Sequence, residues 1–317
     1  MSKQAKIGIL AGISVLLILG FLFIDLGSNW DYALPKRGKK VLAIVLTGGV
    51  IAFSTMIFQT ITNNRILTPS IIGLDSLYML IQTFLIFVLG SMNETVMNKN
   101  VNFLISVSLM VLFAGLLYRL LFKKEGGQNI YFLLLVGIIF GTFFQSISSF
   151  MEVLIDPNEF MIVQDRMFAS FNNVNTDLLM IAMVLIVLTG IYFYRFAKYL
   201  DVLSLGREQA VNLGVDYDYV VKRLLIIVAI LVSIATALVG PITFLGLLVA
   251  NVAHEFMKTY QHKYLILSSI LISIIALVGG QLIVERVFTF STTLSVIINF
   301  AGGMYFIYLL LKENKSW

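Results

Sequence analysis

Residues 199–219 read YLDVLSLGREQAVNLGVDYDY, and this polar stretch lies between two long apolar runs at 177–197 and 220–239. Within the stretch, apolar residues recur at mixed helical spacings among charged and amide side chains. Gly206 and Gly214 punctuate it, and Gly214 follows a short periodic run, where a left-handed glycine commonly ends a helix. The pattern predicts two short helices outside the lipid, although composition alone also fits an ordinary solvated loop.

The composition of the whole chain is that of a membrane protein. Hydrophobic residues make up 59% and charged residues 12% of the 317 residues, and the mean hydropathy is +0.95. Soluble domains carry roughly 25% charged residues. Because this chain has too few polar groups to cover a surface in water, the sequence predicts an all-α polytopic membrane protein. We interpret the net charge of +5 through its distribution over the loops, and not as a nucleic-acid-binding surface.

Several kinds of chemistry are excluded by what the sequence lacks. Cysteine is absent, which rules out disulfides, cysteine-ligated zinc and iron–sulfur clusters. The two histidines, His254 and His262, are too few for a typical histidine metal site, and both fall in one polar connection. The sequence contains no P-loop, so it has no such device for binding ATP. We therefore expect that this chain binds no cofactor of its own and is not an enzyme.

Apolar runs long enough to cross a bilayer recur along the chain. A hydrocarbon core about 30 Å thick needs about 20 apolar residues per helix. The first run follows Lys3 and Lys6 like a signal peptide, but it lacks a clear cleavage site and is interpreted as the first helix. Two of the runs, 241–255 and 291–311, are weaker than the others. The ten predicted spans are 7–24, 41–62, 71–90, 101–121, 130–151, 177–197, 220–239, 241–255, 264–284 and 291–311.

Lysine and arginine are distributed unequally between the two sides that ten spans define. Fifteen of the 22 lie on the side of the N-terminus and of residues 199–219. Because cytoplasmic loops carry the excess of positive charge, both termini and residues 199–219 are predicted to be cytoplasmic. The cluster of Lys36, Arg37, Lys39 and Lys40 on the other side is an exception, which indicates either a function or snorkelling at a helix end.

Four segments carry a resemblance to a known family. Residues 240–256 read GPITFLGLLVANVAHEF, in which the Gly-Pro pair predicts a sharp re-entry into the bilayer and a short helix. This stretch resembles the GPIGFVGLIVPHIAR signature of the FecCD-like permeases, the membrane subunits of ABC importers for iron-siderophores, haem and vitamin B12. The segments LSLGREQAVNLG at 203–214, NNRILTPSIIGLDS at 63–76 and the stretch 262–286 resemble further parts of that family in the same order.

The resemblance implies the ABC type II importer permease fold, with about ten transmembrane helices in one membrane domain over residues 1–317. It implies pairing with a second permease copy or a paralogue around a central pathway. It also implies that residues 199–219 are coupling helices that dock on a cytoplasmic ATPase subunit dimer, which would hold ATP and magnesium. The implied coupling set consists of the apolar contacts Leu205, Ala210 and Leu213, the rim residues Arg207 and Glu208, and the supporting Leu203, Gly206 and Gly214.

The same resemblance implies that an extracellular binding protein docks on basic residues of the outer face. The family's R-x-P-R turn corresponds to residues 33–37, where Ala33 replaces the first arginine, and its second basic position corresponds to Arg286. We therefore expect Lys36, Arg37 and Arg286 to face glutamates of the binding protein. Docking through such rim charges is expected to be sensitive to salt.

Polar or adaptable side chains within apolar helices are candidates for the lining of the pathway, although such residues often bridge neighbouring helices instead. The candidates are Met56, Gln59, Phe143, Gln145 and Ser146. Departures from the family pattern, among them Ala250-Asn251 in place of Pro-His, favour a catecholate-type Fe(III)-siderophore over haem or cobalamin as the substrate. An ion-coupled secondary transporter in the cell membrane is the alternative, and the lack of an intramembrane Asp or Glu series counts against it.

Overall fold

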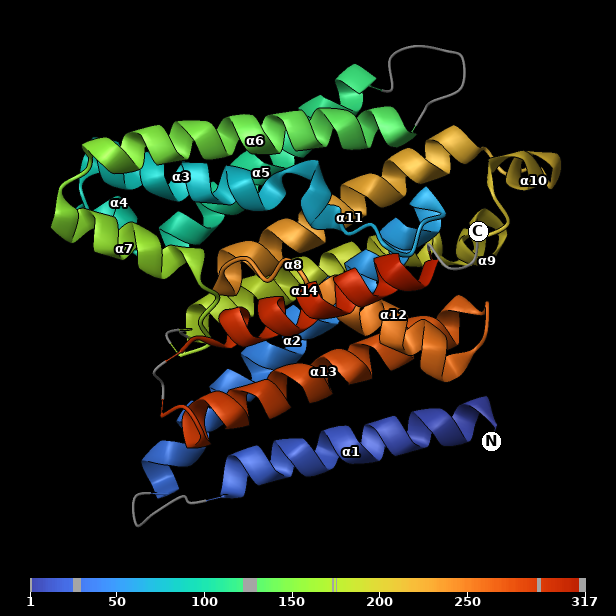
Figure 1. The fold of residues 1–317 in the computed structure, drawn as a ribbon, viewed down its shortest axis with the longest axis horizontal. Helices are drawn as coiled ribbons and strands as arrows, with labels where there is room; N and C mark the ends of the chain where they lie inside the picture. Colours follow the sequence, from blue (N-terminus) through green and yellow to red (C-terminus); the bar gives the residue numbers. More distant parts are fainter. Residues whose placement is uncertain are drawn as a thin grey trace. The chain divides into compact units, whose positions relative to one another are not determined.

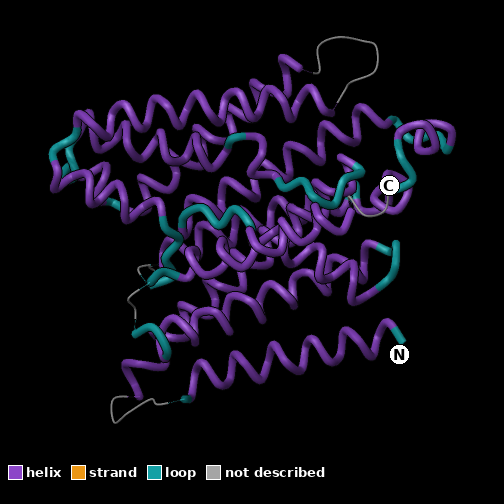
Figure 2. The backbone as a smooth tube through the Cα atoms, viewed as in Figure 1, coloured by secondary structure: helices purple, strands orange, loops and turns teal. Residues whose placement is uncertain are grey.

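The computed structural model describes residues 2–24, 30–121, 130–172, 174, 176–289 and 292–313. All regular elements in these ranges are helical, and short loops join them (Figures 1 and 2). The chain forms two compact units. The first comprises Met1–Thr68, Ser170–Leu179 and Ile242–Trp317, and the second comprises Pro69–Ala169 and Met180–Pro241.

Eight helices of the described residues are long and apolar enough to cross a membrane. They are α1 (Lys3–Phe23), α2 (Trp30–Thr62), α5 (Lys99–Leu121), α6 (Ile130–Leu154), α8 (Thr176–Tyr194), α11 (Tyr217–Val239), α13 (His262–Arg286) and α14 (Leu294–Glu313). Two shorter apolar helices, α3 (Leu74–Leu89) and α12 (Leu245–Met257), bring the number to the ten predicted spans. The predicted span 291–311, which looked weak, is long enough as α14, whereas 71–90 contains the shorter helix α3.

In the first unit, α13 packs against α1, α2 and α12 (Figure 1). Gly48 of α2 permits the close approach of α13, because a Cβ atom at this position would lie 2.6 Å from Ser273 Oγ and 2.7 Å from Leu277 Cδ1. Between the same two helices, Thr60 Oγ1 lies 2.7 Å from His262 Nε2. A small residue on α2 and a paired polar contact therefore allow these two helices to pack closely.

Helix α2 begins well before the predicted start of its span at residue 41. Its first residue is Trp30, and it contains Pro35. The turn expected at residues 33–37 is therefore wrong, since these residues are helical. Proline this close to the start of a helix removes only one early hydrogen bond, and the helix continues through it.

In the second unit, α3 lies beside α6, and α5 lies beside α11 (Figure 1). The smaller elements are η1 (Pro69–Ile72), α4 (Glu94–Met97), α7 (Pro157–Met167) and η2 (Ala197–Tyr199). Helix α7 lies between the predicted spans 130–151 and 177–197. Its start carries recognisable signals, because the Asp156 side chain accepts a hydrogen bond from Asn158 N at 2.9 Å and a proline opens the helix.

A buried polar network fastens α7 to α3 and α5. Arg166 of α7 donates through Nη1 to Gln82 Oε1 and through Nη2 to the Val96 carbonyl at 3.2 Å. Gln82 in turn donates to Asn102 Oδ1 at 3.1 Å and to Ser106 Oγ at 2.9 Å. Burial lowers the pKa of the Arg166 guanidinium below its usual value. The position of α7 therefore depends on the amide of Gln82, which both accepts and donates within the network.

Candidate functional site

A row of polar side chains follows the exposed face of α6, which is otherwise an apolar helix. Thr142, Gln145, Ser146 and Ser149 are all exposed, and their spacing of three and four residues places them on one helical face. Lipid offers no hydrogen-bonding partners to such groups. The face is therefore suited to a water-containing passage or to a second protein surface.

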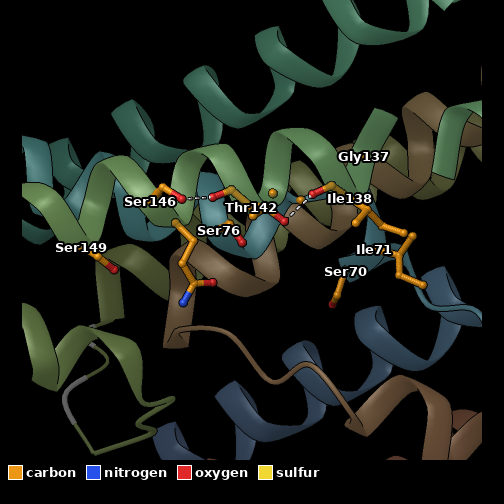
Figure 3. Close-up of a pocket in the computed structure, with 11 residues that line it drawn as sticks. Ser70, Ile71, Ser76, Gly137, Ile138, Thr142, Ser146 and Ser149 are labelled. Atoms are coloured by element: carbon orange, nitrogen blue, oxygen red, sulfur yellow. Dashed lines mark hydrogen bonds between the residues drawn. The ribbon is translucent and has the colours of Figure 1, made fainter. Parts of the chain in front are cut away.

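The polar row borders a cavity of about 460 Å³ within the second unit (Figure 3). Ser70 of η1 and Ser76 of α3 add hydroxyl groups to its wall, and none of the described side chains that line it is charged. Two of the α6 hydroxyls are satisfied by their own helix, since Ser146 Oγ donates to the Thr142 carbonyl at 2.8 Å and Thr142 Oγ1 donates to the Ile138 carbonyl at 2.9 Å (Figure 3). Such a wall can exchange weak hydrogen bonds with a polar solute without holding it tightly.

Two glycines of α6 bring this wall together. A Cβ atom on Gly137 would lie 2.8 Å from both Ile71 O and Ile72 Cα, and one on Gly141 would lie 3.4 Å from Gly73 Cα. Gly73 has a φ of 85°, in the left-handed region that favours glycine. The Gly137–Gly141 pair is thus a GxxxG motif that packs α6 directly against the corner between η1 and α3.

The five residues predicted to line the pathway have different surroundings. Gln145 and Ser146 line the cavity of the second unit. Phe143 is exposed on α6 but does not belong to the cavity wall. Met56 and Gln59 are buried inside the first unit, where Gln59 Nε2 donates at 2.6 Å to a main-chain carbonyl of the loop after α2. The structure therefore gives Met56 and Gln59 packing and loop-holding contacts.

Residues 199–219 contain two short helices, α9 (Leu200–Leu203) and α10 (Arg207–Asn212). Gly206, which precedes α10, has a φ of 97°, and Gly214, which follows it, has a φ of 81°. Both positions need the backbone freedom of glycine. The two predicted short helices and the left-handed glycine at their end are confirmed.

The side chains of this segment divide into an inner and an outer set. Leu203 of α9 and Ala210 of α10 are fully buried within the chain. Leu205 and Leu213 are 56% and 64% exposed, and Val211 is exposed as well. The prediction that Ala210 contacts a partner is therefore wrong, because its side chain supports α10 from inside. The outer apolar set defines the coupling face: Leu205, Val211 and Leu213.

Polar groups surround the coupling face. The Arg207 guanidinium lies 3.6 Å from Asp218 Oδ2 and 5.8 Å from the ring centroid of Tyr217. These contacts join the start of α10 to the start of α11, although an exposed ion pair of this kind adds little stability. Glu208 is exposed on α10. Arg207 thus orients α10, and Glu208 presents a negative charge beside the coupling face.

The two arginines predicted to dock a binding protein meet at the end of α1. Arg37 Nη1 donates to the carbonyls of Phe21 and Leu22, each at 3.2 Å, and of Ile24 at 2.7 Å. Arg286 Nη2 donates to the same Ile24 carbonyl at 3.0 Å. The last carbonyls of a helix lack partners within it and carry partial negative charge. Arg37 and Arg286 therefore cap the C-terminus of α1.

The neighbouring lysines have different surroundings. Lys40 Nζ lies 2.6 Å from Glu285 Oε1, in a largely buried ion pair. Lys36 is exposed, and its Nζ lies 5.8 Å from the ring centroid of Tyr32. Within the described residues Lys36 forms no ion pair. Of the three residues predicted to dock a binding protein, Lys36 therefore presents the most accessible charge.

Comparisons with known proteins agree on one family. The sequence profile of the FecCD transport family matches residues 7–312. The chain is 72% identical over 317 residues, all of both chains, to the petrobactin import system permease protein YclO of Bacillus subtilis. It is 37% identical over 279 residues to the petrobactin import system permease protein FatC of Bacillus anthracis, covering 88% of this chain and 78% of that relative. A solved structure assigned as a metal-chelate type ABC transporter in an inward-facing conformation has the same fold, with a TM-score of 0.81, 19% identity, and coverage of 98% and 100%.

Proposed function

Because the chain belongs to the FecCD transport family, we propose that it is the membrane permease subunit of an ATP-driven importer of an Fe(III)-siderophore. Two relatives are named as petrobactin permeases, and the more similar one matches over its full length, which supports petrobactin or a related catecholate-type chelate as the substrate. The observation that carries the proposal is the exposed polar row on α6 beside an uncharged cavity. Its self-satisfied hydroxyls suit the passage of a polar solute rather than its capture.

A second permease, either another copy of this chain or a paralogue, completes the passage in this proposal. Thr142 and Ser146 are satisfied by their own helix, but the exposed amide of Gln145 on the same face needs a partner that is not lipid. Pairing two such faces would enclose the polar rows and leave the apolar remainder of each helix to the bilayer. The pathway would then be lined from both subunits by hydroxyl and amide groups.

ATP hydrolysis is proposed to take place on a separate cytoplasmic ATPase dimer that holds ATP and magnesium. The coupling face of Leu205, Val211 and Leu213 is the proposed contact. Force transmission requires a rigid element, and α10 is anchored in the chain by its own fully buried Ala210. Apolar side chains of the coupling face would enter a groove of the ATPase, with Glu208 at the polar rim.

The proposed orientation in the cell membrane places both termini and the coupling face in the cytoplasm. An extracellular binding protein would then approach the opposite side and deliver the chelate. Lys36, Arg37 and Arg286 are the proposed docking residues, with Lys36 the most accessible. Arg37 and Arg286 would act in docking while they also cap α1.

The test is the double substitution Leu205→Asp and Leu213→Asp in the complex reconstituted with its cognate ATPase and binding protein. Both side chains are exposed in the isolated chain, so the variant is expected to insert and purify normally. Two buried carboxylates at the interface should abolish binding of the ATPase, substrate-stimulated ATP hydrolysis and chelate uptake, since unpaired charge is costly in an apolar contact.

The matched control replaces the same two residues with methionine, which preserves an apolar surface. This control should retain at least half of the stimulated ATP hydrolysis. Normal uptake by the double aspartate variant would refute the coupling role. Uptake of an unrelated solute in place of the Fe(III)-chelate would refute the substrate while leaving the coupling role standing.

A further inference from the structure

A second cavity, of about 410 Å³, lies in the first unit beside the N-terminal turns of α2. It differs from the cavity beside α6 because charged side chains line it. We call it the lysine cavity. The polar residues of its wall are Asp31, Tyr32, Lys36, Lys39, Lys40 and Asn172.

The basic residues of the lysine cavity share one side of α2. Lys36 follows Tyr32 by four residues, and Lys39 and Lys40 follow Lys36 by three and four, which places them on one helical face. Like charges at such spacings repel each other. Lys40 is balanced by Glu285 at 2.6 Å, whereas Lys36 and Lys39 form no ion pair among the described residues. The two remaining ammonium groups therefore favour an anion between them.

The length of α2 places this cavity at the level of lipid headgroups. The helix has 33 residues, whereas a bilayer core requires about 20, so its first turns extend beyond the hydrocarbon. Trp30 and Tyr32 are 58% and 72% exposed there. Exposed tryptophan and tyrosine at the end of a membrane helix are typical of the membrane–water interface.

We propose that the lysine cavity binds the headgroup of an anionic phospholipid of the phosphatidylglycerol type. The ammonium groups of Lys36 and Lys39 donate to the phosphate oxygens. Asp31, the acidic residue of the wall, accepts a hydrogen bond from a glycerol hydroxyl of the headgroup, and Asn172 contributes an amide to the same wall. A simple phosphate would leave the Asp31 carboxylate facing an anion, so this wall suits a phosphate diester that carries a hydroxyl group.

The experiment measures lipid binding to the purified full-length chain by native mass spectrometry and by thermal stabilisation in detergent. The probes are phosphatidylglycerol, phosphatidylcholine, phosphatidic acid and inorganic phosphate. We expect phosphatidylglycerol to bind most tightly. The double substitution Lys36→Gln and Lys39→Gln should weaken its binding about thirtyfold. Each basic residue near a membrane surface contributes a factor of about five to the affinity, and the two factors multiply. The matched control, Lys222→Gln with Lys258→Gln, removes two lysines that lie outside the cavity and should leave the affinity unchanged.

A second variant tests the hydroxyl contact. Asp31→Ala, which removes the acceptor, should reduce the preference for phosphatidylglycerol over phosphatidic acid about fivefold, which corresponds to one hydrogen bond. Equal losses in the cavity variant and its control would overturn the proposal, because only general surface charge would then matter. Inorganic phosphate that competes at millimolar concentration would also overturn it, in favour of a free anion site. Weaker binding-protein docking with unchanged lipid affinity would assign the lysines to docking instead.

Discussion

Substituting Gly137 by alanine tests whether close packing of α6 shapes the polar cavity. The added Cβ atom would lie 2.8 Å from Ile71 O and Ile72 Cα, and 3.3 Å from the Ile72 carbonyl carbon. All three are main-chain atoms, so no side-chain rotation can relieve the contact. Either α6 or η1 must move by several tenths of an ångström, and the η1 residues Ser70 and Ile71 line the cavity.

The magnitude follows from two opposing effects. Overpacking a well-filled interface costs about 1–3 kcal/mol. Alanine also gains up to about 1 kcal/mol over glycine within a helix. Gly115→Ala is the matched control, because Gly115 is exposed on α5 with no atom within 4 Å of an added Cβ. The helix preference cancels between the two variants, so their difference in unfolding free energy should equal the overpacking cost.

The assay is reversible unfolding in mixed micelles, combined with chelate uptake by the reconstituted importer. Gly137→Ala should be about 1–3 kcal/mol less stable than Gly115→Ala, and uptake should fall because the cavity wall is displaced. Gly141→Ala serves as a comparison on the same helix. Its added Cβ atom would lie at an ordinary distance of 3.4 Å from Gly73 Cα, so this variant should lose less stability than Gly137→Ala. Equal stability of the Gly137 and Gly115 variants would refute the reasoning from close packing.

Two further predictions concern polar contacts between helices. Gln82→Leu should destabilise the protein by about 3 kcal/mol, because Arg166 and Asn102 lose their amide partner. Gln82→Glu should recover only part of this loss, because its carboxylate can pair with Arg166 but cannot donate to Asn102 Oδ1 or Ser106 Oγ. Equilibrium unfolding measures both variants, and a fully stable Gln82→Leu variant would contradict the network. Arg37→Gln should lower the free energy of unfolding by about 1–3 kcal/mol through loss of the α1 cap. The same variant should weaken binding-protein docking at low salt, and unfolding and docking are measured on the same preparation. Weaker docking with unchanged stability would show that the capping contacts contribute nothing.

Much of the helix pattern could be predicted because length and hydropathy alone determine it. The short helices α9 and α10 were also predictable, since Gly206 and Gly214 interrupt the apolar periodicity where left-handed residues are needed. The second span was harder. The apolar run that predicts this span begins only after the lysines at 36–40. Helix α2 nevertheless begins at Trp30, because main-chain hydrogen bonds form a helix whether or not its side chains are apolar.

The side chains of the candidate site were predictable only in part. Gln145 and Ser146 were recognisable because polar side chains on an apolar membrane helix require hydrogen-bonding partners that lipid does not provide. Gln59 satisfied the same criterion, yet its amide holds a loop carbonyl inside the first unit. Ser70 and Ser76 were missed because they come from a different segment, which reaches α6 through the close contacts at Gly137 and Gly141. Polarity within a span indicates a partner, but only the fold identifies it.

The basic cluster at the start of α2 shows how charges of one short segment take separate roles. Arg37 joins Arg286 on the Ile24 carbonyl, and Lys40 is paired with Glu285, so each of these cations already meets oxygen atoms of the same chain. Lys36 and Lys39 retain charge that can attract a ligand. Because Lys36 belongs to both the docking proposal and the lysine cavity, a carboxylate of the binding protein and a lipid phosphate must compete for its ammonium group. Occupation of the cavity by lipid would then weaken docking, and a docked binding protein would weaken lipid binding by the same factor.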